Sequence, residues 1–193
     1  MIYIIRHGQT AKNRTGTLQG RSNAPLDESG IAQARAAAGW FSAEGIHFDK
    51  VYTSPLIRAE ETARILAKDV EIVTEERLIE MDYGPYEGMD LHHLPPELMV
   101  FFSDFVHNPA PHGMESLSSV VSRLGTFLTE ILEEAYKYNL LLSTHAIAMK
   151  GALEYLTPAS EGRYWSKYIG NCSVYGAGVL ENGYEIPREL WHP

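Results

Sequence analysis

The sequence contains little cysteine and no long apolar run. Its 193 residues include one cysteine, Cys172, so no internal disulfide can form. No pair of closely spaced cysteines and no cysteine–histidine cluster is present, and we therefore expect no zinc or other metal site. The N-terminal apolar run, residues 2–5, ends at Arg6 and is too short for a signal peptide or a membrane span. We expect a cytoplasmic protein that does not bind membranes.

Basic residues are also scarce, and the net charge of −9 argues against nucleic acid as a partner. Residues 1–26 nevertheless carry four basic side chains and no acidic one, which leaves −13 for the rest of the chain. Residues 69–90 hold eight acidic side chains, and no lysine or arginine occurs between Arg77 and Arg123. A small basic region on an acidic chain suits an anionic small molecule, although chance clustering on a solvated surface would look the same.

Strands and helices are expected to alternate along the chain. Short β-branched or aromatic runs indicate buried strands, and apolar residues at helical spacing indicate helices between them. This alternation predicts a three-layer α/β sandwich, with a mostly parallel central sheet and helices on both faces. The expected strands are 2–5, 50–53, 70–73 and 140–143, the helices are 28–43, 55–67 (capped by Ser54), 95–106 in part and 115–138, and a C-terminal hairpin joins 172–180 to 184–186.

Reactive side chains follow three of the expected strands. Arg6 and His7 come directly after the first, Arg58 lies shortly after the second, and His145 follows the fourth. Parallel strands present their carboxyl ends at one edge of a sheet, so these groups can converge. Arginine donates paired hydrogen bonds to phosphate oxygens, and a histidine there can be a nucleophile or a general base. The pattern predicts a phosphate site.

Five ordered blocks of sequence resemble the histidine phosphatase superfamily, in its phosphoglycerate-mutase-like branch. Together they run from residue 6 to residue 146, about three quarters of the chain. A lone Arg-His-Gly is weak evidence, but five blocks in the family's order are strong evidence. The matching segments are Arg6-His7-Gly8-Gln9-Thr10 with Asn13 and Leu18-Gln19-Gly20, Ser54-Pro55-Leu56 with Arg58-Ala59, Leu78-Ile79-Glu80 with Glu87-Gly88, Glu115-Ser116, and Ser143-Thr144-His145-Ala146.

The resemblance implies a role for each matching residue. His7 would become phosphorylated, while Glu80 would protonate the leaving oxygen and then activate water. Asp82 and Glu87 lie near enough in sequence to serve as the acid instead. No cofactor is implied. The residues implied to bind the phosphoryl group or the substrate are Arg6, Arg58, His145, Asn13, Gln19, Gly20 and Ala146.

The resemblance covers both phosphatases and mutases. Mutases tend to carry extra basic residues that grip a second acidic group, and the acidic stretch after Glu80 has none. We therefore predict a metal-independent phosphomonoester phosphatase acting on a small metabolite. A cofactor-dependent phosphoglycerate mutase and a non-catalytic phosphate-binding protein are the alternatives. We expect residues 1–193 to form a single domain with a lid-like insertion at about 83–113. Before Glu115-Ser116, Met114 stands where the family often has a glycine. The sequence does not indicate the oligomeric state.

Overall fold

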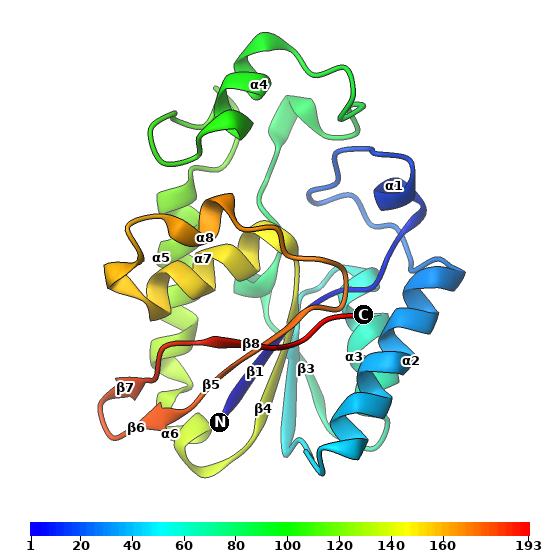
Figure 1. The fold of residues 1–193 in the computed structure, drawn as a ribbon, viewed down its shortest axis with the longest axis vertical. Coiled ribbons are helices and arrows are strands. Elements are labelled where there is room, and N and C mark those ends of the chain that lie inside the picture. Colours follow the sequence, from blue (N-terminus) through cyan, green and yellow to red (C-terminus); the bar gives the residue numbers. More distant parts are fainter.

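A computed structural model describes residues 1–193, and its centre is a six-stranded sheet (Figure 1). The strand order is β3-β2-β4-β1-β5-β8. The first four of these run parallel, β5 is antiparallel to β1, and β8 is antiparallel to β5. The strands are β1 (Ile2–Arg6), β2 (Lys50–Thr53), β3 (Ile72–Thr74), β4 (Leu140–Thr144), β5 (Val174–Ala177) and β8 (Arg188–Trp191).

Helices cover both faces of this sheet, as the alternating pattern predicted. Side chains alternate along β1, so Tyr3 and Ile5 pack in one core cluster while Ile2 and Ile4 pack in a larger one. The three-layer α/β prediction is confirmed. The smaller cluster includes side chains of α2 (Glu28–Ala43) and α3 (Ile57–Leu66), and the larger one includes those of α5 (Leu117–Glu130), α6 (Leu132–Lys137) and α7 (Ala146–Leu156).

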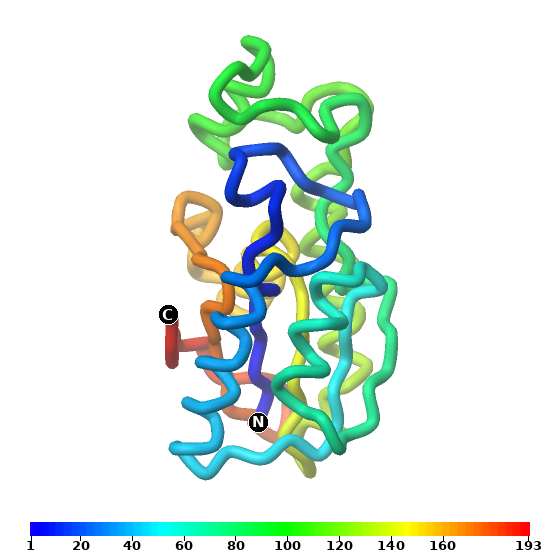
Figure 2. The backbone as a smooth tube through the Cα atoms, turned by 90° about the vertical axis from the view of Figure 1, so that its right-hand side faces the viewer, coloured from blue at the N-terminus to red at the C-terminus, as the bar shows by residue number.

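The segment 83–113 rises above the carboxyl ends of the strands and returns to its starting point (Figures 1 and 2). It contains η2 (Gly84–Tyr86) and α4 (Pro96–Ser103). Its two ends meet closely, because a Cβ atom on Gly84 would lie 2.0 Å from the carbonyl oxygen of Gly113. Both glycines have positive φ, +51° and +89°, so neither position suits another residue. The shorter elements elsewhere are α1 (Ala11–Arg14), η1 (Glu76–Leu78), η3 (Pro158–Ser160), α8 (Arg163–Ser166), β6 (Val179–Leu180) and β7 (Gly183–Tyr184).

Several element boundaries differ from the sequence predictions. The third strand begins at Ile72 rather than at residue 70, because its pairing with β2 starts there. The predicted helix 115–138 is divided at Ile131, whose ψ of 4° interrupts the helical backbone. The predicted C-terminal hairpin is also wrong in part: β5 joins the central sheet, and only β6 and β7 form a hairpin. The sequence analysis missed α7 and β8 altogether.

The helix expected from residue 55 begins instead at Ile57, and Ser54 does not act as its N-cap. Leu56 is the capping residue and makes no side-chain cap bond. The hydroxyl of Ser54 contacts His145 instead. None of the helices combines the length and the hydropathy that crossing a bilayer would require.

Candidate active site

His7 directly follows β1 and is 3% exposed. Its Nδ1 lies 2.6 Å from the carbonyl oxygen of Gly8, which can only accept a hydrogen bond. The proton of the neutral imidazole therefore lies on Nδ1, and Nε2 carries a lone pair. Burial lowers the pKa of His7 well below its usual value, and the nearby charges of Arg58 and Arg6 lower it further. At neutral pH His7 presents an unprotonated Nε2, as nucleophilic attack requires.

Arg58 is fully buried and lies in the first turn of α3. Its Nε donates to Nε2 of His7 at 3.2 Å, while Nη1 and Nη2 donate to the carbonyl oxygens of Ser22 and Gly20 at 2.8 and 2.6 Å. Burial lowers the pKa of Arg58 to about 10, so the guanidinium is still charged at neutral pH. The loop of residues 20–22 therefore fixes a cation directly beside Nε2 of His7.

Glu87 holds the other side of this loop. Its carboxylate accepts hydrogen bonds from the backbone amides of Gly20, Arg21 and Ser22 at 3.0–3.2 Å. The loop is thus bonded to Glu87 through its amides and to Arg58 through its carbonyls. Glu87 is fully engaged here and is not available as the acid.

His145 is the last residue before α7, and its ring centroid lies 5.1 Å from that of His7. Its Nε2 is 2.7 Å from Oγ of Ser54, and its Nδ1 is buried with no hydrogen-bond partner. Burial lowers the pKa of His145 well below its usual value, with additional lowering by the charge of Arg58 and by His7. Two neutral imidazoles therefore lie side by side at the carboxyl ends of β1 and β4.

Glu80 lies at the N-terminus of α7, immediately beyond His145. Its Oε1 accepts from the amides of Met81 and Ala148 at 2.8 and 3.0 Å, and its Oε2 accepts only from Ile147 at 3.2 Å. Free amides and the positive end of a helix dipole favour a carboxyl group at this position. Oε2 therefore has the fewer backbone contacts of the two carboxylate oxygens.

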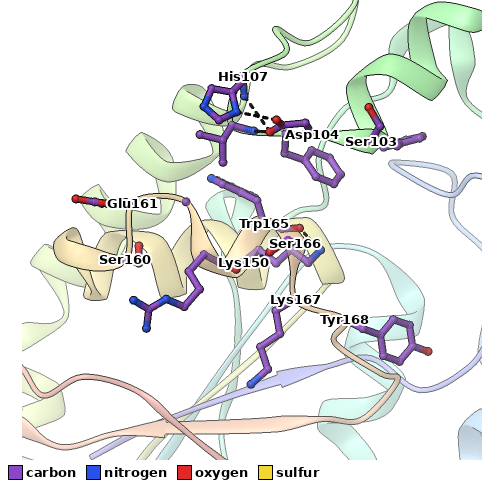
Figure 3. A pocket seen from close by; sticks show the side chains of 15 residues that line it. Ser103, Asp104, His107, Lys150, Ser160, Glu161, Trp165, Ser166, Lys167 and Tyr168 are labelled. Carbon is purple, nitrogen blue, oxygen red and sulfur yellow. Dashed lines mark hydrogen bonds and ion pairs between the residues drawn. The ribbon is translucent and has the colours of Figure 1, made fainter.

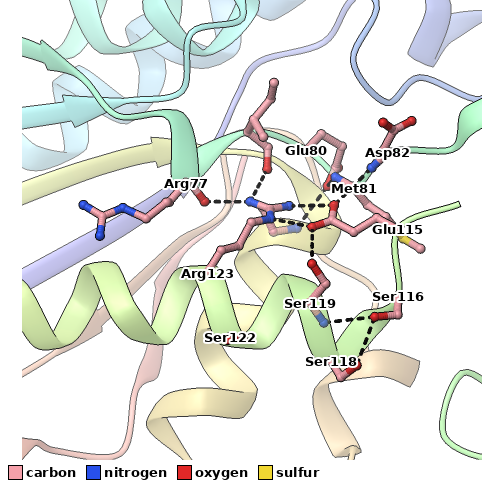
Figure 4. A network of polar contacts seen from close by, with 12 residues as sticks. Arg77, Glu80, Met81, Asp82, Glu115, Ser116, Ser118, Ser119, Ser122 and Arg123 are labelled. Atoms are coloured by element: carbon pink, nitrogen blue, oxygen red, sulfur yellow. Dashed lines mark hydrogen bonds and ion pairs between the residues drawn. The ribbon is translucent and has the colours of Figure 1, made fainter.

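A second layer of contacts holds the peptide before Glu80 (Figure 4). Arg123 on α5 donates to the carbonyl oxygens of Arg77 and Ile79 at 2.6 and 2.7 Å. It also binds both oxygens of Glu115, at 2.8 and 3.2 Å. Burial alone would raise the pKa of Glu115, but the hydrogen bonds and charge of Arg123, with the bonds from Asp82 and Ser119, together outweigh burial and hold the pKa below its usual value. This pair anchors Glu80 in position.

Arg21 and Asp82 lie at the edge of the same network. Arg21 pairs with Asp82 at 3.1 Å and with Glu115 at 3.5 Å. Asp82, the second alternative for the acid, is thus paired with a cation, whereas Glu80 is bonded to the amides of Ile147 and Ala148, shortly after His145. Of the three candidate acids, only Glu80 occupies a position next to His145.

Three predicted site residues hold buried polar atoms without a partner. These are Nε of Arg6, Nε2 of Gln19 and Nδ1 of His145, and Thr157 is the only other residue with such an atom. Arg6 is held through Nη1, which donates to the carbonyl oxygen of Ile169 at 2.6 Å. Gln19 is held through Oε1, which accepts from the hydroxyl of Thr10 at 2.7 Å. An unpaired buried donor costs about 1–3 kcal/mol, so such atoms concentrated in one place suit an anionic ligand.

The other predicted binding residues have different surroundings. Oδ1 of Asn13 accepts from the amide of Thr10 and from the side chain of Asn171, which also donates to the carbonyl of His7. The amide of Gly20 donates to Glu87, and its carbonyl oxygen accepts from Arg58. Ala146 opens α7 between His145 and the amides that hold Glu80. The roles predicted for these residues in substrate binding stay predictions.

A cavity of about 780 Å³ lies beside this cluster, between α8 and the stretch 102–107 (Figure 3). Lys150 on α7 lines it, and Nζ donates to the carbonyl oxygen of Trp165 at 2.8 Å without forming a salt bridge. Burial lowers the pKa of Lys150 to about 8, and the charge of Glu80 partly offsets this effect. The sequence has no lysine or arginine between Arg77 and Arg123, but in the folded protein α7 places the cation of Lys150 near Glu80.

Sequence reasoning missed several residues that shape the site. Ser54 was interpreted as a helix cap, and Lys150, Arg123 and Asn171 were not considered. Only Ser54 offered a signal, as a small polar residue that follows a strand. The others contact the site from helices or loops distant in sequence, and nothing in their local sequence indicates such contacts.

Comparisons with known proteins agree with this geometry. The profile of the histidine phosphatase superfamily (branch 1) matches residues 2–189. Phosphoserine phosphatase 1 of Hydrogenobacter thermophilus is 30% identical over 177 residues, which cover 89% of this chain and 83% of the relative. A 2,3-bisphosphoglycerate-dependent phosphoglycerate mutase of Parvibaculum lavamentivorans is 32% identical over 200 residues, with 98% and 95% covered.

A solved structure also resembles the protein closely. YhfR of Bacillus stearothermophilus superimposes with a TM-score of 0.86 at 26% identity, covering 96% of this chain and 94% of its own. The family profile spans nearly all of the sequence, and the two relatives match over more than four fifths of it. With two histidines and Arg58 at the carboxyl edge of an α/β sheet, the chain belongs to the histidine phosphatase superfamily.

Proposed function

We propose that the protein hydrolyses small phosphomonoesters through a phosphohistidine formed on Nε2 of His7, with no metal taking part. The unpaired buried nitrogens of Arg6, Gln19 and His145, together with the unprotonated Nε2 of His7, carry this proposal. These donors and Arg58 suit the charge that spreads over the oxygens of a transferring phosphoryl group.

In the first step, Nε2 of His7 bonds to phosphorus while the bond to the ester oxygen breaks. Arg58 exchanges its contact with Nε2 for contacts with the phosphoryl oxygens. The departing oxygen takes a proton from Oε2 of Glu80. In the second step, Glu80 accepts a proton from water, whose oxygen bonds to phosphorus, and the His7–phosphorus bond breaks to release phosphate.

We further propose that residues 1–193 act as one domain, with the segment 83–113 covering the leaving group. That segment rises over the strand ends that carry His7 and His145. The partner would be a small phosphomonoester. A cytoplasmic setting suits the free, buried thiol of Cys172, since thiols stay reduced there.

The test is release of phosphate from an aryl phosphate in the presence of a chelator. We expect turnover by the wild-type protein and loss of at least about 10⁴-fold in kcat for His7→Ala. His47→Ala is the matched control, because that histidine is exposed and precedes β2, away from the carboxyl ends of the strands. Chelator-sensitive turnover, or full activity of His7→Ala, would contradict the proposal.

A mutase is the second candidate, and Lys150 is the observation that favours it. A half-buried cation without a carboxylate partner suits a substrate with a second anionic group, as in a phosphoglycerate. Supplying the protein with 3-phosphoglycerate and a bisphosphorylated primer distinguishes the two reactions. A phosphatase releases phosphate, whereas a mutase transfers the phosphoryl group to another hydroxyl and releases little.

A further inference from the structure

The two ring nitrogens of His145 have contrasting surroundings. Nε2 lies 2.7 Å from Oγ of Ser54, whereas Nδ1 is buried and has no partner in the protein. Nδ1 is therefore the only ring nitrogen left for a substrate. Whether it offers a proton or a lone pair depends on the direction of the hydrogen bond between Ser54 and Nε2.

The hydroxyl of Ser54 settles this direction, because its own hydrogen needs an acceptor. Ser54 is fully buried, and its Oγ already accepts from the amide of Leu56 at 3.3 Å. Nε2 of His145 is the only other group within hydrogen-bond distance of that oxygen. If Nε2 were the donor, the Ser54 hydrogen would be buried without a partner, at a cost of about 1–3 kcal/mol.

The acceptor role of Nε2 fixes the tautomer of a neutral His145. Burial and the nearby charges of Arg58 and Arg6 disfavour protonation of this ring, and no carboxylate is hydrogen-bonded to it. With the lone pair of Nε2 committed to Ser54, the single ring proton lies on Nδ1. The free nitrogen of His145 is then an N–H donor.

We propose that Ser54 is a positioning residue that holds His145 as the Nδ1–H tautomer, so that a neutral imidazole donates a hydrogen bond to a phosphoryl oxygen. This inference rests on the proposed function. The other tautomer would turn a lone pair toward an anionic oxygen and repel it. Serine thus converts a histidine that burial leaves uncharged into a phosphate ligand.

The two histidines then share one tautomer but present opposite atoms. The carbonyl of Gly8 binds Nδ1–H of His7 and leaves the lone pair on its Nε2, which accepts from Arg58 until substrate binds. The hydroxyl of Ser54 binds Nε2 of His145 and leaves its Nδ1–H free to donate. The carbonyl oxygen of Gly8 and the hydroxyl of Ser54 therefore give different roles to two imidazoles whose centroids are 5.1 Å apart: His7 attacks phosphorus, and His145 donates a hydrogen bond.

The test measures the tautomer directly, by NMR of the full-length protein carrying ¹⁵N-labelled histidine. In the wild-type protein we expect a proton on Nδ1 of both His7 and His145. In Ser54→Ala we expect His145 to shift toward the Nε2–H form while His7 is unchanged. The value of kcat for an aryl phosphate should fall about 10-fold to 100-fold in this variant, as one donor to the transition state is weakened.

Ser143→Ala is the matched control. Ser143 is fully buried, and its hydroxyl donates to the carbonyl oxygen of Ala59 at 2.8 Å, so this variant also loses one buried hydrogen bond. It should leave the tautomer of His145 unchanged and keep kcat within about twofold of the wild type. Ser54→Thr retains a hydroxyl and should restore both the tautomer and most of kcat.

A proton on Nε2 of His145 in the wild-type protein would overturn the proposal, whether or not Ser54→Ala folds. Equal kcat values for Ser54→Ala and Ser143→Ala would also overturn it. The NMR result needs no turnover, so it stands apart from the proposed function. A wild-type protein with Nδ1–H on His145 but no His7-dependent phosphate release would contradict the function alone.

Discussion

The strand ends and the segment 83–113 are built in contrasting ways. At the strand ends, His7, Arg58, Glu80 and His145 are at most 4% exposed, and their contacts connect residues far apart in sequence. In the segment 83–113 Glu87 binds the distant loop 20–22, but the polar side-chain contacts of residues 90–108 are local, such as His93 with Asp90 and His107 with Asp104.

The same segment exposes several large apolar side chains, namely Leu91, Met99, Val100 and Val106. Elements with few long-range bonds open more easily than a core built from distant contacts. We therefore expect the fixed part of the site to bind the phosphoryl group, which every substrate shares. We expect the looser part to face the group that differs between substrates. Substitutions in the two parts should therefore affect different kinetic constants.

Of the substitutions that compare the two parts, Arg58→Lys should have the largest effect, and it tests the fixed part. Lysine cannot reach His7, Ser22 and Gly20 together, because it lacks the planar fork of arginine. We expect kcat to fall about 100-fold to 1000-fold, by a similar factor for every phosphomonoester. Phosphate release from several esters measures this.

Arg64→Lys is its control on the same helix. Arg64 is exposed and pairs only with Glu60 at 2.6 Å, so its replacement should change kcat by less than about twofold. If kcat of Arg58→Lys fell for one ester only, Arg58 would recognise the leaving group. The proposed division of roles between the strand ends and the segment 83–113 would then be wrong.

Gly84→Ala tests the looser part at its base. A Cβ there would lie 2.0 Å from the carbonyl oxygen of Gly113, and φ is +51°. We expect a loss of about 2–3 kcal/mol in the free energy of unfolding. We also expect a raised KM, with kcat for an aryl phosphate changed by less than kcat in Arg58→Lys. Denaturant unfolding and steady-state kinetics measure these effects.

Gly88→Ala separates the clash from the backbone strain. Gly88 has φ of +84°, but no atom lies within 4 Å of the position of its Cβ. It should therefore show the strain alone, about 1 kcal/mol, with a smaller change in KM. If Gly84→Ala and Gly88→Ala had the same unfolding free energy and the same KM, the close contact between Gly84 and Gly113 would not matter for the segment 83–113.

What the sequence could predict follows the same division. The strand ends carry their chemistry in short local blocks, so His7, Arg58, Glu80 and His145 were identifiable before their contacts were known. Helix α7 was missed because its largely apolar sequence lacks a clear polar face. Lys150 was not predicted for a related reason: it lines a cavity that forms only where α8 and residues 102–107 meet α7. Contacts assembled from distant segments leave no local pattern.

The pH dependence of stability tests whether both histidines are buried in neutral form. Burial holds the folded pKa values of both well below about 6.5, the usual value for histidine. Below pH 6.5 the unfolded chain binds protons that the folded protein does not, so stability falls as pH decreases toward the folded pKa values. Each histidine contributes a slope of about 1 kcal/mol per pH unit in that window.

Denaturant unfolding between pH 6.5 and 5.5 measures this slope. A double variant, His7→Asn with His145→Asn, should show a shallower dependence, whatever its stability at pH 7. The acidic limb of kcat/KM should also lie below pH 6.5, because His7 stays unprotonated there. Parallel slopes for the two proteins would mean that at least one of these histidines is protonated in the folded state.

The smallest effect is expected for Lys150→Met, and it tests where the two regions meet. Lys150 lines the cavity beside residues 102–107 and has no salt-bridge partner, so it is free to bind an anionic leaving group. We expect KM to rise about tenfold for a phosphomonoester that carries a carboxylate, which corresponds to about 1.4 kcal/mol. KM for an uncharged aryl ester should change by less than about twofold.

Two features make this outcome specific to the charge of Lys150. The pKa of about 8 means that wild-type KM for the carboxylated ester should rise above pH 8 and approach that of Lys150→Met. Lys167→Met is the control, since Lys167 lines the same cavity but pairs with Glu189 at 2.8 Å. If both variants, or neither, raised KM, the anion would not be bound by Lys150. Specificity would then lie in the segment 83–113 alone, and the two regions would be independent.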